Sequence, residues 1–293
     1  MTTTEPMESF AARLREHAPV AGADLLGVAP IERFDDLPAD KHPASIFPEV
    51  RSVLVVGKRI TRGTLRGVEE GTQFDLYRQY GRDWLNNRVL ATATYRISEF
   101  LEDNGWEAVP MPNLPTEIPP VGIPVREGSP APNVMMDFDD AAVRAGLGEI
   151  GVCGLLLTPR FGPRQRIQII LTDAPLPPDA MLTEPVCLGC KDLEAVCPLG
   201  AIRTADIEDL TIAGKTMRVA GAIASLCGKC RNGVETNPYH ASGQPDRCAS
   251  LCTRNCVVRL EMADRLEGRF ENPFRRRAPW GFVEEVKRLG GAQ

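Results

Sequence analysis

Cysteine is the residue type whose spacing in this chain points most directly to chemistry. The sequence has 293 residues and nine cysteines. Thiolates bind iron and zinc strongly, and clustered cysteines in a chain without an export signal more often hold metal than form disulfides. A metal centre is therefore predicted from the eight cysteines of the segment 187–256, which are Cys187, Cys190, Cys197, Cys227, Cys230, Cys248, Cys252 and Cys256.

The first of these cysteines follow half of a bacterial ferredoxin motif, CxxCxxCxxxCP. Cys187, Cys190 and Cys197 are in register with that motif, but Leu193 occupies the position of its third cysteine. In the motif the closely spaced thiolates bind one cube and the last cysteine binds the other. We therefore expect Cys197 to belong to a different cluster from Cys187 and Cys190. The eight cysteines are predicted to bind two 4Fe-4S clusters, and the sequence leaves their division open.

Two other arrangements of the cysteines remain open. The pairs Cys187/Cys190 and Cys227/Cys230 could make a tetrahedral zinc site. One cluster with additional buried thiols is the second arrangement, because free cysteine is a common core residue. The last three cysteines of the segment are spaced four residues apart, so on a helix they would share one face and could contribute to both clusters.

Composition excludes several classes of function. The formal net charge is −5 and 43% of the residues are hydrophobic, which fits globular domains and gives no basic surface for a nucleic acid partner. No segment approaches the roughly 20 apolar residues that span a bilayer, and the N-terminus lacks the pattern of an export signal. We therefore expect a cytoplasmic protein that binds neither nucleic acid nor membranes.

The hydrophobic pattern predicts elements of both kinds. Helices are expected at 8–17, 73–104 and 139–145, and strands at 24–31, 52–60, 154–158 and 165–172. The proline-rich segment 110–133 should be a surface loop, and 173–185 has the composition of a linker. The predicted domains are therefore 1–180 for the substrate and cofactor, 181–262 for the clusters, and 263–293 as a C-terminal helix and arm.

Three glycines form a second motif upstream of the cysteines. Gly146, Gly148 and Gly151 match GxGxxG, but a helical pattern precedes them and a strand-like run follows. This order is the reverse of that in a dinucleotide-binding unit. The glycines are better explained by a tight turn at a helix end, or by the close approach of a flat cofactor to the backbone.

The run AGLGEIGVCGLLLTPRFG, together with CLGC and CPLGAI further along, resembles the superfamily of epoxyqueuosine reductases and reductive dehalogenases. The resemblance implies an α/β fold with a nitroreductase-like N-terminal domain, of the kind found in cobalamin-processing proteins, and a ferredoxin-like module with two clusters. It implies that an external donor of ferredoxin or flavodoxin type passes single electrons through the clusters to a corrinoid. Gly146, Gly148, Gly151 and Cys153 would bind that corrinoid (cobalamin).

The same resemblance suggests a small-molecule substrate. Epoxyqueuosine reductases usually carry a C-terminal helical extension that helps hold tRNA, and nothing after Cys256 is long enough to be one. Tyr80 and Arg82 lie in a stretch, YGRDW, that is similar to the superfamily's GRDYH and could supply an acid or an anion clamp. Asp137 and Asp139 could replace the superfamily's catalytic acid, or could form the acidic first turn of a helix.

Several expectations stay open on the sequence alone. Cys153 stands where the superfamily usually has asparagine, and could be a buried thiol, a residue facing the cofactor or a cluster ligand. The chain could be a reductase with its own substrate, an electron-transfer or reductive-activation protein without one, or a zinc-stabilised structural protein. Its oligomeric state, a homo-oligomer included, is not fixed by any motif.

Overall fold

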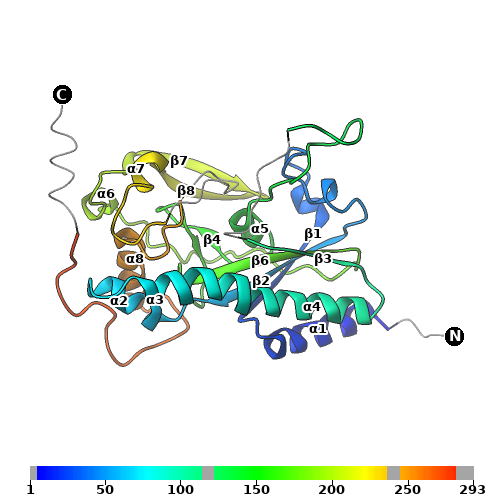
Figure 1. Ribbon diagram of the computed structural model, residues 1–293, viewed down its shortest axis with the longest axis horizontal. Helices are drawn as coiled ribbons and strands as arrows, with labels where there is room; N and C mark the ends of the chain where they lie inside the picture. Colours follow the sequence, from blue (N-terminus) through cyan, green and yellow to red (C-terminus); the bar gives the residue numbers. More distant parts are fainter. Residues whose placement is uncertain (1–4, 114–121, 236–244, 282–293) are drawn as a thin grey trace.

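A four-stranded antiparallel sheet lies at the centre of the N-terminal half (Figure 1). The computed structural model describes residues 5–113, 122–235 and 245–281. The strand order is β1 (Leu25–Pro30), β2 (Ser52–Arg59), β6 (Gln165–Thr172) and β3 (Ala108–Met111). The predicted strands at 24–31, 52–60 and 165–172 are thus confirmed. Strand β3 enters the segment predicted as a proline-rich loop, and its edge position explains why Pro110 is tolerated there.

Helices cover both faces of this sheet. On one face, α1 (Met7–Ala21) and α4 (Ala91–Asp103) pack on apolar residues of β2 and β6. On the other, α5 (Phe138–Arg144) contributes to a second apolar cluster. Strand β6 has a neighbouring strand at each edge and helices above and below, so all eight of its residues are buried. The mixed α and β architecture predicted from the sequence is confirmed.

One long helical segment leads from the cysteine end of the molecule to the opposite end. It begins with α3 (Asp75–Tyr77), continues through the π-helical stretches Arg78–Asp83 and Leu85–Leu90, and ends with α4. This confirms the helix predicted over 73–104, which stops where Gly105 adopts a φ of 85°. The four-residue spacing of Val89, Ala93, Ile97 and Leu101 in the sequence predicts that all four face the core, and for Val89 this prediction is wrong. The π-helical turns are wider than α-helical ones, so Leu90 is buried there and Val89 is 46% exposed.

The cysteine region forms the other end of the molecule (Figure 1). Its elements are the hairpin β7 (Ile202–Ile212) and β8 (Lys215–Ala222) and the short helices α6 (Leu193–Val196) and α7 (Ala224–Cys227), followed by α8 (Leu251–Met262). The hairpin was not predicted, because most residues of β7 are exposed and carry no regular alternation. Its signal was the turn Ala213-Gly214, in which both residues have positive φ.

Buried ion pairs join the N-terminal half to the cysteine region. The carboxylate of Glu69 in α2 (Arg66–Glu69) accepts a hydrogen bond of 2.7 Å from Nε of Arg254 in α8, and the Arg254 side chain is fully buried. The same carboxylate binds Nε of Arg275 at 2.5 Å. Because a buried charge is stable only when it is paired, Glu69 fixes α8 against α2 of the N-terminal half.

Short elements connect these parts. The strands β4 (Glu149–Ile150) and β5 (Leu156–Leu157) form a small separate sheet, so the strand predicted at 154–158 is shorter than expected. Single turns of 3-10 helix occur at Ile31–Phe34, Pro43–Ser45 and Arg62–Leu65. The predicted linker 173–185 contains no helix or strand and is held to the sheet, because Asp179 accepts a hydrogen bond from the backbone N–H of Val28.

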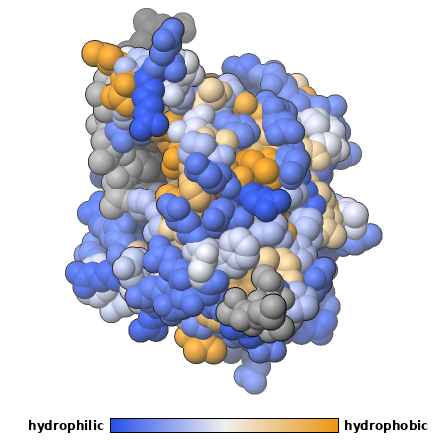
Figure 2. All heavy atoms as spheres, turned by 90° about the vertical axis from the view of Figure 1, so that its right-hand side faces the viewer, coloured by the Kyte–Doolittle hydropathy of each residue, from blue (hydrophilic) through white to orange (hydrophobic). Residues whose placement is uncertain are grey.

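The surface opposite the cysteine elements is mostly hydrophilic, with apolar side chains gathered near its centre (Figure 2). Within the described ranges, no helix has both the length and the apolar character needed to cross a membrane.

Candidate metal centre

Four cysteines from three separate segments line one cavity. They are Cys153, Cys187, Cys190 and Cys256, and we call this space the first cysteine cavity. Its wall is completed by Val152, Leu193, Asn255 and Arg259, among others. Leu193, which stands in the position of the missing ferredoxin cysteine, is therefore part of the wall.

Four further cysteines line a second cavity. They are Cys197, Cys227, Cys230 and Cys252, and we call this space the second cysteine cavity. The structure thus places Cys197 apart from Cys187 and Cys190, as the ferredoxin rule requires. Cys252 and Cys256 lie on α8 four residues apart, about 6 Å along the helix axis. One turn of a single helix therefore separates the two cavities.

Hydrogen-bond donors surround the cysteine sulfurs. The backbone N–H groups of Val152 and Gly189 donate to Cys187 Sγ at 3.3 and 3.4 Å, and that of Ala201 donates to Cys197 Sγ at 3.2 Å. The hydroxyl of Ser250 lies 2.9 Å from Cys252 Sγ. Donors of this kind stabilise thiolates and adjust the potential of iron-sulfur clusters, so both cavities suit an anionic cluster.

Burial opposes the formation of these thiolates when no cation is bound. It raises the pKa of the Cys227 thiol to about 11 and also raises the pKa of Cys252. A group that holds these sulfurs as thiolates must therefore supply positive charge, as iron or zinc does.

The positions of the two CxxC pairs argue against the zinc site that they could have formed. Cys187 and Cys190 lie at one cavity, whereas Cys227 and Cys230 lie at the other, so these pairs do not meet. Among the described residues, no three cysteine, histidine or carboxylate side chains gather closely enough for a single metal ion. A zinc ion needs its sulfurs at about 2.3 Å, while a cube binds each thiolate through a different iron atom.

The glycine run fixes the start of the cysteine segment. Glu149, 5% exposed, accepts hydrogen bonds from the backbone N–H groups of Val186 and Cys187 at 2.8 and 2.7 Å. Three residues later, Val152 donates to the Cys187 sulfur. Sequence reasoning missed Glu149; an acidic residue inside an otherwise apolar turn was the available signal.

The three glycines themselves are packed against the chain. A Cβ at Gly146 would lie 2.1 Å from the carbonyl oxygen of Ala180, and one at Gly148 would lie 2.2 Å from that of Leu157. A Cβ at Gly151 would lie 2.6 Å from the Leu157 side chain. Gly146 also has a φ of 75° after α5. The turn and its internal packing account for the motif, and these positions do not fit a platform for a flat cofactor.

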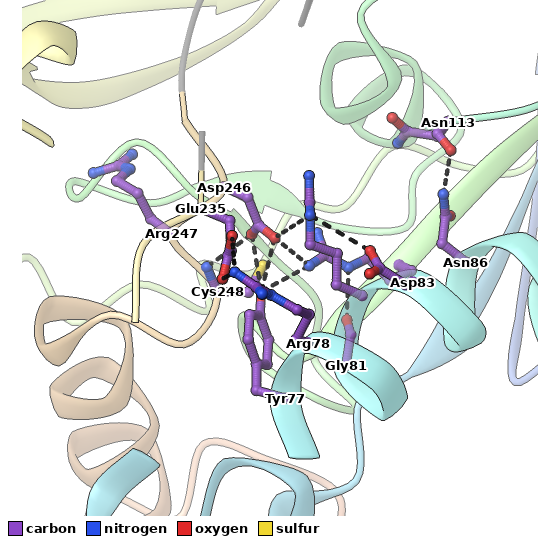
Figure 3. A network of polar contacts seen from close by, with 12 residues as sticks. Tyr77, Arg78, Gly81, Asp83, Asn86, Asn113, Glu235, Asp246, Arg247 and Cys248 are labelled. Carbon is purple, nitrogen blue, oxygen red and sulfur yellow. Dashed lines mark hydrogen bonds and ion pairs between the residues drawn. The ribbon is translucent and has the colours of Figure 1, made fainter. Parts of the chain in front are cut away.

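Cys248 lines neither cysteine cavity. Its backbone N–H donates to Asp246 Oδ1 at 3.1 Å, and burial raises the pKa of its thiol to about 12. It belongs to a polar network between the long helical segment and β6 (Figure 3). The structure therefore places seven of the eight predicted ligands at the cavities, with Cys153 in addition and Cys248 outside.

Asp246 is the centre of that network. Its carboxylate, 1% exposed as a side chain, lies 2.6 Å from Nη2 of Arg166 and accepts a hydrogen bond from the hydroxyl of Tyr77 at 2.9 Å. Burial works against the charge, but Arg166 and the hydrogen bonds hold the pKa of Asp246 below its usual value. This ionic contact fixes residues 246–248 to the N-terminal half.

Arg247 points away from the network (Figure 3). It lines the second cysteine cavity, and its Nη2 donates to the carbonyl oxygen of Gly154 at 2.9 Å. Its Nε and Nη1 are buried and have no protein partner within the described residues. Burial lowers its pKa, but Cys252, Cys153 and Cys227 outweigh that effect and the pKa is raised. The pKa of Arg247 therefore responds to cysteines of both cavities.

The predicted catalytic residues are dispersed. Tyr80 is 55% exposed and packs edge-to-face on Trp84, so Tyr77, three residues earlier, takes the interior position. Arg82 joins the network, with its Nε 3.6 Å from Asp246 Oδ2. Asp137 caps α5 by accepting from the N–H groups of Asp139 and Asp140. Asp137 therefore stabilises the N-terminus of a helix, which is the second of the two roles considered for it from the sequence.

Comparison with known proteins adds to these observations. No protein-family model matches the chain. A tetrachloroethene reductive dehalogenase from Desulfitobacterium hafniense is 37% identical over 116 residues, which make up 39% of this chain and 17% of the relative. One from Sulfurospirillum multivorans is 28% identical over 235 residues, 42% of the relative. The chain thus spans less than half the length of these relatives.

Solved structures give the same result over more of the chain. The catabolic reductive dehalogenase NpRdhA superposes with a TM-score of 0.55 and 19% identity, over 91% of this chain and 35% of that one. The fold is that of the reductive dehalogenases. The predicted resemblance is therefore confirmed. A second reductive dehalogenase, whose structure suggested a mechanism for B12-dependent dehalogenation, has a TM-score of 0.54 and 18% identity over 36% of its chain.

Removal of the Asp246 carboxylate tests the network. Asp246→Ala leaves the buried Arg166 cation without a counter-ion, so we expect the free energy of unfolding to fall by about 3–5 kcal/mol. Tyr77→Phe removes one hydrogen bond to a charged group and should lower it by about 1.5–3 kcal/mol. Urea denaturation followed by circular dichroism measures both values.

Glu235→Ala is the matched control for these variants. Glu235 pairs with Arg78 across 3.2 Å, with side chains 25% and 53% exposed, so its loss should lower the free energy of unfolding by less than about 1 kcal/mol. Equal effects of Asp246→Ala and Glu235→Ala would show that the network does not anchor this segment.

Proposed function

We propose that the chain is an iron-sulfur reductase that passes single electrons through two 4Fe-4S clusters to a corrinoid in the N-terminal domain, where a small molecule is reduced. The observation that carries the proposal is the pair of cysteine cavities on one helix. Cys187, Cys190 and Cys256 would bind one cluster, and Cys197, Cys227, Cys230 and Cys252 the other. Such clusters supply one-electron steps.

The surroundings of the cavities support a direction for the electrons. The second cysteine cavity is lined by residues of the segment 197–252 alone, whereas Val152 and Cys153 of the N-terminal half reach the first. The second cavity would accept electrons from an external donor of ferredoxin or flavodoxin type. The first would deliver them to a nitroreductase-like domain at 1–180, with the cluster module at 181–262 and the arm at 263–293.

The N-terminal half receives no assigned cofactor residue. Gly146, Gly148 and Gly151 are packed against the chain's own atoms, so they are not proposed to hold a corrinoid. The support for a corrinoid is the likeness to reductive dehalogenases. A small-molecule substrate fits the relatives named for tetrachloroethene, and the formal net charge of −5 does not favour tRNA.

The packed glycines favour a second candidate function. A chain without a corrinoid would be an electron-transfer or reductive-activation protein that docks on another protein. Both functions need the clusters, and only the first needs a cofactor in the N-terminal half.

Iron analysis tests the two-cluster part. Anaerobic reconstitution should give about eight iron atoms and eight sulfides per chain, with no stoichiometric zinc. Cys227→Ala removes a ligand of the second cysteine cavity and should lower the iron to about four atoms. Cys248→Ala, which alters a partly buried thiol outside both cavities, should leave the iron unchanged. A colourless protein that binds zinc instead would contradict the proposal.

Corrinoid uptake separates the two candidate functions. The reconstituted chain is incubated with hydroxocobalamin without oxygen and passed through a desalting column, and cobalt and iron are measured in the protein fraction. The reductase proposal predicts about one cobalt per chain. Iron-loaded protein that never retains cobalt would leave the electron-transfer protein as the function.

Arginine variants test the charges around the clusters. Arg247 lies near sulfurs of both cavities, so Arg247→Met should lower both midpoint potentials by on the order of 50–100 mV, because a nearby cation favours the reduced, more negative cluster. Arg259 lines the first cysteine cavity alone, so Arg259→Met should affect the first cluster only. Potentiometric titrations followed by electron paramagnetic resonance (EPR) distinguish the two. Equal shifts in both variants would contradict this assignment.

A further inference from the structure

We infer that Cys153 is the fourth ligand of the cluster in the first cysteine cavity, in place of the cysteine that Leu193 replaces. The inference rests on the proposed two-cluster function. A cube has four irons and is normally held by four thiolates. Cys187, Cys190 and Cys256 provide three, and the ferredoxin position that would supply the fourth holds a leucine.

The structure places Cys153 where that ligand is needed. It lines the same cavity as the other three cysteines and is 4% exposed. Leu193 lines that cavity too, and it packs in the apolar cluster that contains Cys153. A sulfur at residue 153 can therefore serve the iron that residue 193 cannot.

The backbone around Cys153 is fixed from several directions. The N–H of Val152 donates to Cys187 Sγ, and the carbonyl oxygen of Val152 accepts from the N–H of Ala220 in β8 at 2.9 Å. On the other side, the N–H of Gly154 donates to the Gly151 carbonyl oxygen at 2.8 Å, while the Gly154 carbonyl oxygen accepts from Arg247. A ligand held this rigidly loses little conformational entropy when it binds metal.

The other cysteine without a place in the ferredoxin motif gives a direct comparison. Cys248 is partly buried, but it lines neither cavity and faces the Asp246 network. The two remaining thiols thus have different surroundings, and only Cys153 shares a cavity with three other cysteines.

This ligand set has a consequence for the fold. Cys153 precedes the segment 173–185, while its three partners follow that segment. A cluster bound by all four would link the N-terminal half covalently to the cysteine region. Loss of that cluster should therefore loosen the contact between the two halves, which a ferredoxin module with all its ligands in one segment would not do.

The test uses the full chain reconstituted with iron and sulfide without oxygen. Cys153→Ala should lower the iron from about eight to about four or seven atoms per chain, through loss of one cube or its conversion to a three-iron cluster. The EPR signal of the other reduced cluster should persist. Cys248→Ala is the matched control and should retain the iron content and spectra of the wild type.

Two further variants keep the test decisive if Cys153→Ala folds poorly. Cys153→Ser is nearly isosteric and offers oxygen in place of sulfur, so the EPR and absorption spectra of one cluster should change while the fold is kept. The double variant Cys153→Ala/Leu193→Cys restores the CxxCxxC spacing and should recover iron that Cys153→Ala loses.

The outcomes separate this inference from the proposed function. Wild-type protein that binds no iron would overturn both. Wild-type protein with about eight iron atoms, together with unchanged iron and spectra in Cys153→Ala and Cys153→Ser, would overturn the role of Cys153 alone. Loss of iron that Leu193→Cys fails to restore would also count against it.

Discussion

The contact between the turn 146–153 and the start of the cysteine segment is the constraint on which the candidate metal centre depends. Glu149 binds the backbone N–H groups of Val186 and Cys187, and Val152 donates to the Cys187 sulfur. The glycines let this turn pack closely on itself, because a Cβ at Gly148 or Gly151 would collide with Leu157. The glycine run is thus explained by the packing of the turn that positions Cys187, rather than by a ligand that it touches.

Helix α8 provides the second fixed reference. Its N-terminus is capped by Ser250, whose hydroxyl accepts from the N–H of Thr253 at 3.4 Å. Cys252 and Cys256 then extend to different cavities, and Arg254 between them is neutralised by Glu69 of the N-terminal half. The ion pair with Glu69 fixes the helix at Arg254, and the Asp246 network fixes the residues just before its start. Contacts with the N-terminal half therefore determine where both cavities lie.

The sequence predicted the elements better than it predicted the side chains at the centre. Residue type identified the segment that supplies most of the cysteines at the two cavities, and the ferredoxin motif anticipated that Cys197 lies apart from Cys187. Sequence spacing, however, carries no information on which thiol of a distant segment reaches a given cavity. For this reason Cys153 and Cys248 could not be told apart until the turn and the Asp246 network were placed.

The same limit applies along the long helical segment. Four-residue periodicity correctly placed Ala93, Ile97 and Leu101 in the core, but it assumes a uniform helix. The π-helical stretches before α4 change the face that each residue presents. Tyr77 is consequently buried against Asp246 and Tyr80 is exposed, although both tyrosines are equally compatible with the periodic pattern.

Buried arginines show how the charge of the two halves is balanced. Arg166 has Asp246, Arg254 has Glu69, and Arg144 has Asp36 and Asp140, so each of these cations is neutralised by carboxylates. Arg247 is equally buried, yet within the described residues its side chain donates to a carbonyl oxygen and has no ion pair with a carboxylate, and the charges that raise its pKa belong to cysteines. A buried cation needs a compensating negative charge. In the proposed two-cluster protein, thiolate-ligated clusters would supply that charge.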